Sequence, residues 1–399
     1  MRVMLRRRVA RGKEVRERLA ERRGVDAAPR PAGTLLWLHG ASVGEALSAI
    51  GVVRAFLDAD ASAHVLFTTN TVASARLLGE RLPARAFHRF VPLDVPAWGA
   101  RFLDHWRPDA AAFIESEIWP NLLAGCARRS VPVVLLNGRM SARSLRRWRR
   151  APGFARAVLR RFERIEAQSA VDAERFAALG ARQVRNAGNL KFAAAPLPVA
   201  ADELARLKVL LMGRPVWIAA STHEGEEEIA TAVHTALAAR HEGLVTIIAP
   251  RHPERRLALA GARRSLGGDP PDGGVWLADT MGELGLLYRL APVAFVGGSL
   301  IPHGGQNPLE PARLGCAVAV GPHHFNFAEP VSAMREAGGL AVVDTPDALT
   351  GWVDAMLADP ARRARMAAAG AAAADRFADL PERVAAMLAG LVRRAHVAA

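Results

Sequence analysis

Short apolar runs rich in β-branched residues alternate with helical patterns along most of the chain, and this alternation limits the possible folds. It is typical of parallel sheets covered by helices. In the first half we expect strands at residues 35–39, 65–69, 88–92, 111–115, 131–137 and 164–168. In the second half we expect them at residues 216–221, 245–250, 275–279, 293–296, 317–320 and 340–343. Each set predicts one doubly wound sheet of the α/β class.

A length of 399 residues favours two domains over a single core. The segment AAAPLPVAA, residues 193–201, has the prolines and small residues of an interdomain connection. We therefore expect one Rossmann-like domain over residues 1–195 and a second over residues 196–399. An Ala-rich helical tail starts near Ala361, and it could pack back across the first domain. Ligands bind beyond the carboxyl ends of such strands, which predicts a cleft between the two lobes.

The formal charge of +14 calls for an anionic partner, which could be nucleic acid, acidic lipid or a phosphorylated substrate. A hydrophobic share of 51% argues against disorder. Cys126 and Cys316 show no metal-ligand spacing and cannot form a disulfide framework, which fits a reducing, cytoplasmic compartment.

The arginine-rich segment of residues 1–24 reads as one basic helix whose start carries Val3, Met4 and Leu5. Such a helix could lie on an anionic membrane leaflet, or it could be solvated with no partner. We find no apolar run typical of a signal peptide or long enough to span a bilayer. Any membrane contact is therefore expected to be peripheral.

Two motifs of the first half place carboxylates at strand ends. In HGASVGEALSAI, Ser42 is a plausible N-cap and Glu45 lies in the first helical turn, where it could be functional or merely compensate the helix dipole. These glycines do not match G-x-G-x-x-G, which counts against an NAD enzyme. In FIESEIWPNLL, Glu115 and Glu117 would lie on one side of an extended chain.

Cationic residues follow in the next motifs. Arg139 or Arg143 of LLNGRMSARS could pair with the two carboxylates, so a structural ion pair explains that motif as well as catalysis does. Lys191 of GNLKF is a rare lysine in an arginine-rich chain. It suggests a site that needs a compact ammonium group, although chance also explains it.

The second half contains FVGGSLIPHGGQNPLEPA, residues 295–312. Its glycine turns could let a phosphate approach the backbone beside a helix start, with Glu310 on the hydroxyls of a ribose. The alternative is an ordinary strand, glycine loop and capped helix. In STHEGEEE, the hydroxyl residues at the strand end could offer amides to a phosphate, and Arg251 of APRHPER suits a phosphate or a carboxylate. No Asp-x-Asp lies at a strand end, so we expect no metal and no cofactor.

Taken together and in order, these motifs closely resemble the 3-deoxy-D-manno-octulosonic acid (Kdo) transferases of bacterial lipopolysaccharide synthesis. The resemblance extends from Leu35 to Phe327 and is carried by GASVGE, FTTNT, ESEIWPN, NGRMSARS, GNLKF, STHEGEEE, PRHPER, DTMGE, FVGGSL, GGQNPLEPA and GPHHFNF. It implies the glycosyltransferase B fold and an inverting, metal-independent transfer of Kdo from CMP-Kdo to the lipid A precursor, lipid IVA. It implies Glu45 as proton acceptor and Glu115 and Lys191 as stabilisers of the transition state. The CMP contacts implied by the resemblance are Pro250, Arg251, Met281, Gly282, Glu283, Asn307, Pro308, Leu309 and Glu310.

The same resemblance implies a peripheral position at the cytoplasmic face of the bacterial inner membrane, and the basic first domain would suit the two phosphates of the lipid acceptor. Family members commonly begin with a hydrophobic anchor, whereas this chain begins with a short arginine-rich region. One rival hypothesis is another two-lobed glycosyltransferase that uses a UDP-sugar. A second is a basic nucleic-acid-binding module. It rests on charge alone, so we expect no nucleic-acid partner.

Overall fold

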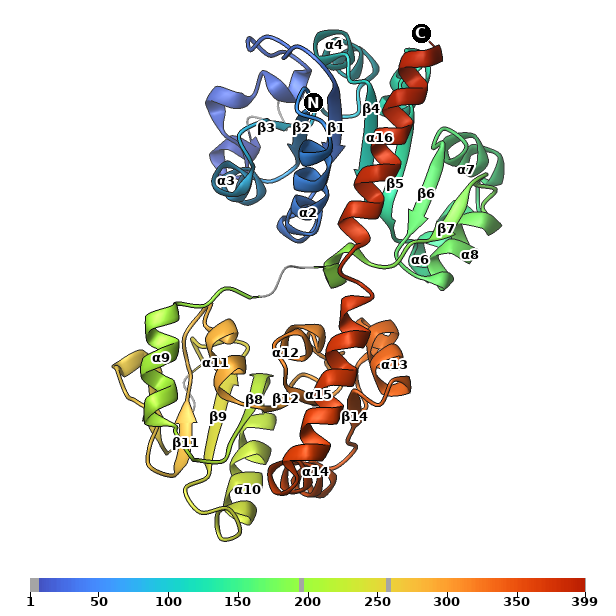
Figure 1. Ribbon diagram of the computed structural model, residues 1–399. Helices are drawn as coiled ribbons and strands as arrows, with labels where there is room; N and C mark the ends of the chain where they lie inside the picture. Colours follow the sequence, from blue (N-terminus) through green and yellow to red (C-terminus); the bar gives the residue numbers. More distant parts are fainter. Residues whose placement is uncertain (1–6, 194–196, 256–259, 399) are drawn as a thin grey trace. The chain divides into compact units, whose positions relative to one another are not determined.

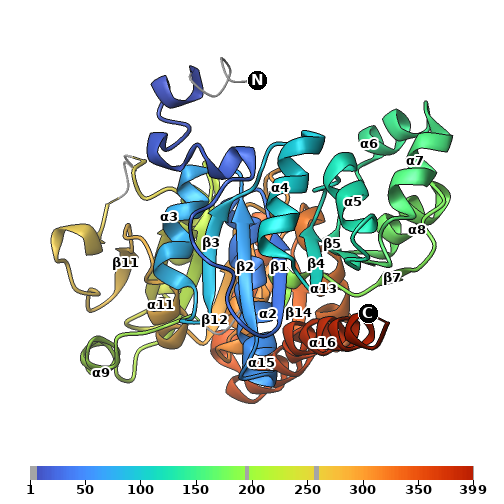
Figure 2. The same ribbon diagram turned by 90° about the horizontal axis from the view of Figure 1, so that it is seen from above.

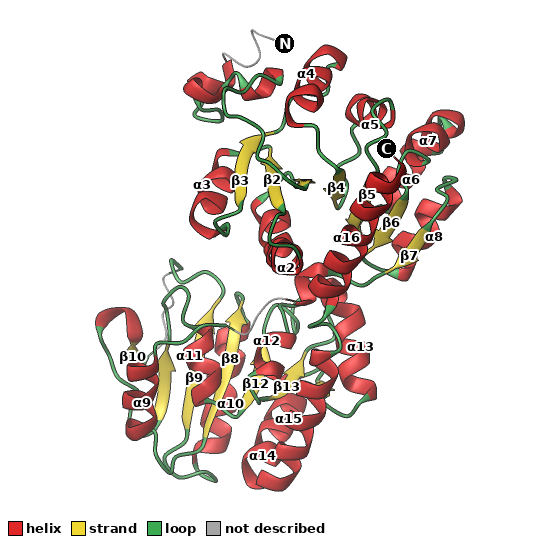
Figure 3. Ribbon diagram, turned by 45° about the horizontal axis from the view of Figure 1, so that its top comes forward, coloured by secondary structure: helices red, strands yellow, loops and turns green. Residues whose placement is uncertain are grey.

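The computed structural model describes residues 7–193, 197–255 and 260–398. Internal contacts divide the chain into two compact units, Met1–Ala194 with Asp379–Ala399, and Ala195–Ala378. The chain thus enters the second unit once and returns to the first for its last residues. Each unit contains one seven-stranded parallel sheet, and helices cover both of its faces (Figures 1 and 3).

The first unit has the strand order β3-β2-β1-β4-β5-β6-β7. Its strands are β1 (Leu35–His39), β2 (His64–Thr69), β3 (Ala86–Phe90), β4 (Ala110–Ile114), β5 (Val133–Gly138), β6 (Arg164–Ala167) and β7 (Val184–Asn186). Its α-helices are α2 (Val43–Ala59), α3 (Val72–Arg81), α4 (Pro96–Trp106), α5 (Pro120–Ala127), α6 (Ala142–Trp148), α7 (Pro152–Leu159), α8 (Ala170–Ala178) and α16 (Leu380–Ala398). Short 3-10 helices are η1 (Arg16–Arg18), η2 (Glu21–Arg23) and η3 (Leu190–Ala193).

Strand β1 shows why this sheet needs two helical layers. All five of its residues are buried. Leu36 and Leu38 pack in a core with α2 and α16, whereas Leu35 and Trp37 pack in a second core with α4 and α5. Side chains of a strand alternate between faces, so a continuous apolar run requires cover on both sides. Figures 1 and 2 show α16 running alongside α2 on the first of these faces.

The second unit has the order β10-β11-β9-β8-β12-β13-β14. Its strands are β8 (Val216–Thr222), β9 (Val245–Pro250), β10 (Ala262–Arg263), β11 (Gly274–Leu277), β12 (Val293–Val296), β13 (Ala317–Val320) and β14 (Leu340–Val342). Its α-helices are α9 (Ala201–Leu210), α10 (Glu226–Ala238), α11 (Leu284–Leu290), α12 (Leu309–Arg313), α13 (Ala328–Glu336), α14 (Pro346–Ala358) and α15 (Pro360–Asp375). The 3-10 helices are η4 (Arg264–Leu266) and η5 (Phe325–Phe327).

The doubly wound α/β prediction is confirmed, and every expected strand exists within a few residues of its predicted bounds. The sequence did not indicate β7 and β10, which are edge strands of three and two residues. The Ala-rich tail divides between the units, since α15 belongs to the second and α16 packs in the core of the first. This differs from the expectation that residues 196–399 form one domain, because the apolar face of α16 is buried by α2.

The amino-terminal segment is not the single basic helix that the sequence suggested. Residues 7–10 are helical, Gly12 and Gly24 adopt positive φ, and η1 and η2 lie between them. Val3, Met4 and Leu5 lie outside the described residues. The prediction failed because some of its arginines bind carboxylates and backbone carbonyls of the first unit rather than facing solvent.

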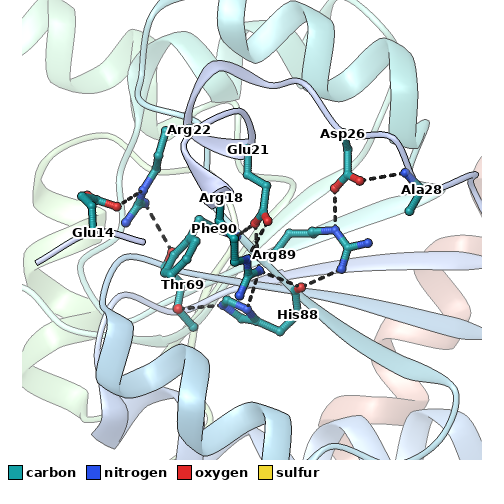
Figure 4. Close-up of polar contacts among 10 residues, drawn as sticks. All are labelled: Glu14, Arg18, Glu21, Arg22, Asp26, Ala28, Thr69, His88, Arg89 and Phe90. Atoms are coloured by element: carbon teal, nitrogen blue, oxygen red, sulfur yellow. Dashed lines mark hydrogen bonds and ion pairs between the residues drawn. The ribbon is translucent and has the colours of Figure 1, made fainter. Parts of the chain in front are cut away.

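Figure 4 shows how these ion pairs hold the segment against the edge of the first sheet. The guanidinium of Arg22 is buried, with Nε 3.0 Å from a carboxylate oxygen of Glu14. Arg18 binds Glu21, whose carboxylate accepts the Phe90 backbone N–H at 2.6 Å. Burial, together with the charge of Arg18, lowers the pKa of His88 to about 3. The neutral ring can then accept from Arg18 through Nδ1, 3.1 Å away.

Within the described parts of the chain, no helix is both long and apolar enough to span a bilayer.

Candidate active site

Glu45 lies where β1 gives way to α2. Ser42 caps α2 as expected, its Oγ accepting the Glu45 backbone N–H at 3.3 Å. The Glu45 carboxylate in turn accepts from the Ala41 N–H at 2.7 Å and from the Ser42 hydroxyl at 2.8 Å. This is a reciprocal cap related to the capping box, with the Ala41 N–H in place of the N-cap N–H, so the structural role considered for Glu45 is real. Each carboxylate oxygen keeps a second lone pair that could accept a proton.

Burial also changes the acidity of this carboxyl. Desolvation raises the pKa of Glu45 more than the hydrogen bonds from Ala41 and Ser42 lower it. The charges of Glu115 and Glu117 raise it further. A carboxylate destabilised in this way is a stronger base than an exposed one. The arrangement therefore combines a helix cap with a candidate general base.

Glu115 follows β4 directly, and its backbone is left-handed with φ of 58°. Residues other than glycine rarely adopt this backbone conformation, and those that do are found more often at functional sites than elsewhere. Its carboxylate binds the Lys191 ammonium at 2.7 Å. Asn137 places Lys191 there, because its side-chain oxygen accepts the Leu190 N–H of η3 at 3.0 Å.

The second carboxylate of the ESE motif has different partners. Glu117 accepts from the Trp119 indole N–H at 2.8 Å and lies 3.0 Å from Nε2 of the fully buried His39. Burial tends to raise the pKa of Glu117, but the hydrogen bonds from His39 and Trp119 outweigh it and hold the pKa below its usual range. The expectation that both carboxylates lie on one side of an extended chain is therefore wrong. The backbone turns at Glu115, and the two side chains bind different partners. No local pattern indicated that His39 contacts Glu117, 78 positions away.

Arg139 and Arg143 were considered as cationic partners of these carboxylates. Within the described residues, Arg139 instead donates its backbone N–H to the Glu115 carbonyl at 3.1 Å, and Lys191 supplies the cation. Since β1 and β4 are neighbours at the point where the strand order reverses, Glu45 and Glu115 share the switch point of the first sheet. Ligands of doubly wound sheets bind at such points.

The predicted nucleotide residues lie at or after the carboxyl ends of strands, along one edge of the second sheet. Pro250 ends β9, residues 281–283 follow β11, and residues 307–310 follow β12. The charge of Arg251 acts on the Glu310 carboxylate, so these two segments lie close together. Burial raises the pKa of Glu310, partly offset by a hydrogen bond from Asn307 at 3.1 Å.

Glu283 is less available than the sequence suggested. Arg264 donates to its carboxylate at 2.8 Å and holds the pKa of Glu283 below its usual range, helped by a hydrogen bond from Thr280. Met281, by contrast, is exposed. Gly282 adopts φ of 82°, which a residue without a side chain tolerates.

The first glycine pair after β12 serves the protein rather than a ligand. Glu226 is buried, and its carboxylate accepts the backbone N–H groups of Gly298, Ser299 and Leu300 at 2.6 to 3.0 Å. A Cβ at Gly297 would lie 2.7 Å from Glu226 Oε2, so this position requires glycine. An internal carboxylate already uses these amides, which favours the alternative of an ordinary glycine loop at this turn.

Helix α12, expected to offer a helix start to a phosphate, has five residues and therefore only a small dipole. In the described part of the chain, no group of three or more His, Cys, Asp or Glu side chains is placed to hold a metal ion.

Comparison with known proteins identifies the family. A family model described as 3-deoxy-D-manno-octulosonic-acid transferase (kdotransferase) matches residues 14–194. A probable 3-deoxy-D-manno-octulosonic acid transferase, mitochondrial, of Arabidopsis thaliana is 37% identical over 372 residues, which cover 88% of this chain and 83% of that protein. The 3-deoxy-D-manno-octulosonic acid transferase of Haemophilus influenzae is 36% identical over 372 residues, which cover 89% of this chain and 87% of that protein. The chain belongs to the Kdo transferase family.

Solved structures of other enzymes share the fold of this Kdo transferase, as one neighbour illustrates. The UDP-GlcNAc 2-epimerase of Neisseria meningitidis aligns with a TM-score of 0.60 over 90% of this chain and 100% of that one, at 14% identity. At that identity the likeness shows the fold alone, which is the two-sheet arrangement of the glycosyltransferase B class. The C-terminal CMP-Kdo binding domain of WaaA from Acinetobacter baumannii is 34% identical and covers 43% of this chain and 96% of that domain, with a TM-score of 0.41.

Proposed function

We propose that this Kdo transferase moves Kdo from CMP-Kdo to the lipid A precursor with inversion at the anomeric carbon. The observation that carries the proposal is the Glu45 carboxylate, whose pKa is raised by burial at the switch point of the first sheet. A nearby ion pair of Glu115 and Lys191 supports it. Membership of the Kdo transferase family also supports Kdo transfer as the reaction at this site.

In the proposed reaction, an acceptor hydroxyl gives its proton to Glu45 while its oxygen attacks the anomeric carbon of Kdo. The bond between that carbon and the phosphate oxygen of CMP breaks, and CMP departs with the electron pair. Lys191 would stabilise charge that develops in the transition state, while Glu115 holds its ammonium group in place. No step requires a metal ion.

The donor would bind the second unit. We assign CMP to three segments that share one sheet edge, and Arg251 suits its phosphate because its forked N–H groups match oxyanions. Glu310 would accept from the ribose hydroxyls. The full set of proposed CMP contacts is Pro250, Arg251, Met281, Gly282, Glu283, Asn307, Pro308, Leu309 and Glu310.

The acceptor would bind the first unit, at the surface of an anionic membrane. A hollow of about 320 Å³ there is lined by Ser144, Arg147, Trp148, Ala151 and Phe154. The Trp148 and Phe154 rings stack with centroids 6.0 Å apart. Aromatic faces beside an arginine suit a phosphorylated, acylated sugar, and such an acceptor would be met at the cytoplasmic face of the inner membrane.

The donor class is tested by incubating the purified protein and a tetraacylated lipid A precursor with CMP-Kdo or with UDP-sugars. We expect release of CMP and a lipid product heavier by the mass of Kdo, measured by mass spectrometry. Release of UDP without any release of CMP would favour the rival UDP-sugar glycosyltransferase and end this proposal.

Replacing Arg251 by alanine should weaken CMP binding by roughly 10- to 100-fold, since a hydrogen bond to a charged group contributes about 1.5–3 kcal/mol. Isothermal calorimetry with CMP measures the effect. Arg240→Ala is the matched control, because Arg240 follows α10 and pairs with Asp354, away from the proposed contacts. Equal CMP affinities for Arg251→Ala and the unaltered protein would remove Arg251 from the site.

A further inference from the structure

Three histidines meet at the switch point of the second sheet, where β8 and β12 are neighbours. His223 follows β8, and its ring centroid lies 3.9 Å from that of His303 and 5.9 Å from that of His252. His303 belongs to the loop after β12 and His252 follows β9, so three separate segments bring the rings together. The proposed CMP contacts do not include these residues.

Gly298 leaves room for this histidine cluster. A Cβ at Gly298 would lie 3.1 Å from the His223 ring and 3.6 Å from the side-chain nitrogen of Gln306. Gly298 also has φ of 65°. Glycine at this position therefore lets the His223 ring rest against the loop. Gln306 fixes the ring further, with its amide nitrogen 3.2 Å from His223 Nε2.

Positive charge is concentrated around His223. Burial lowers the pKa of His223 to about 4, and His303, His252, Arg251 and Arg255 lower it further. The ring is consequently neutral at physiological pH and can accept a hydrogen bond from Gln306. The groups that act on His223 besides its burial are thus two histidines and two arginines.

The nearby carboxylates are already engaged. Glu226 accepts the loop amides, and Glu227 binds Arg255 at 3.0 Å. Glu254, whose side chain is exposed, lies 3.3 Å from His252. His252 and His303 are both exposed, so a ligand can reach their rings. Among the described residues, no hydrogen bond or ion pair is made by the ring of His303.

We propose that His223, His252 and His303 form a second anion site of the donor pocket, which takes an oxyanion at the sugar end of the nucleotide sugar. His252 and His303 would contact the oxyanion, and His223 would position the His303 ring beneath it. The inference rests on the proposed function, in which the donor carries a phosphate and the carboxylate of an ulosonic acid. Either group has the chemistry that such a site recognises.

The test uses the full-length double variant His252→Ala/His303→Ala, because both side chains are exposed and the fold should tolerate their loss. We expect KM for CMP-Kdo to rise at least tenfold, with kcat and the Tm changed much less. His241→Ala is the matched control, since His241 precedes β9 at the opposite edge of the sheet and pairs with Asp354. Its KM should match that of the unaltered protein.

Calorimetry with CMP and with cytidine identifies which oxyanion is bound. If CMP binding weakens in the double variant while cytidine binding does not, the site takes the phosphate. If CMP binding is unchanged while KM for CMP-Kdo rises, the site takes the sugar carboxylate. If the unaltered protein transfers Kdo and the double variant has the same KM and CMP affinity, the histidine site is overturned while the proposed function stands. An unaltered protein that transfers no Kdo would overturn the proposed function.

Discussion

Replacing Glu45 by glutamine should lower the rate of Kdo transfer by roughly 10² to 10⁴, the usual contribution of a general base. Glutamine has nearly the same shape, and its amide oxygen can still accept a hydrogen bond at the start of α2. The hydrogen bonds from Ala41 and Ser42 that the structure shows can thus be largely replaced. What glutamine cannot do is take a proton, so this change separates the catalytic role from the structural one.

The pH profile supplies an independent readout of the same variant. A protonated carboxyl cannot act as a base, so kcat/KM of the unaltered protein should fall as the pH drops through the raised pKa of Glu45. The residual activity of Glu45→Gln should lack that acid limb. CMP affinity and Tm should stay close to those of the unaltered protein. If Glu45→Gln keeps full activity, Glu45 is only a helix cap.

Replacing Arg22 by alanine should destabilise the first unit by about 3 kcal/mol, because the buried Glu14 carboxylate loses its buried partner and keeps the more exposed Arg8, whose Nε lies 2.9 Å away. The Arg22 and Glu14 side chains are 1% and 2% exposed and lie 3.0 Å apart. Arg22 also donates to the Val91 carbonyl at 3.1 Å and the Asn70 carbonyl at 2.6 Å, which the variant leaves without that donor. Differential scanning calorimetry should show the Tm of this unit lowered by roughly 10 °C.

Arg16→Ala is the control for this experiment. Arg16 belongs to η1, only six positions earlier, and is exposed. The Arg16→Ala substitution removes the same charge from the same segment, yet it should change the free energy of unfolding by no more than about 0.5 kcal/mol. A Tm for Arg22→Ala that equals the Tm of Arg16→Ala would show that the buried ion pair does not stabilise the amino-terminal segment.

Much of the fold could be predicted from the chain because buried parallel strands are apolar runs. The strands at Leu35–His39, Val245–Pro250, Val293–Val296 and Ala317–Val320 have their predicted bounds. The two edge strands were missed because they are short and lack such a run. The Ser42 cap was visible because the hydroxyl and Glu45 stand three positions apart, a local signal that depends on helix geometry alone.

Less of the candidate site could be predicted, because its side chains come together from distant segments. Glu115 and Lys191 are 76 positions apart, and local sequence did not favour their ion pair over one with Arg139. His223 and Gln306 are 83 positions apart, and both were passed over. The glycines at positions 297 and 298 indicated a close approach, but not that a buried glutamate and a histidine are what approach them.

By itself, the sequence determined the class of fold, the two sheets and the family, since these depend on local periodicity and on motifs that stand in order along the chain. Only the tertiary structure decided the partners of each charged group and the separation of α16 from the unit that precedes it. The physical reason is that burial and ion pairing depend on which segments pack together. An arginine is exposed to solvent at position 16, whereas an arginine six positions later is buried and forms an ion pair.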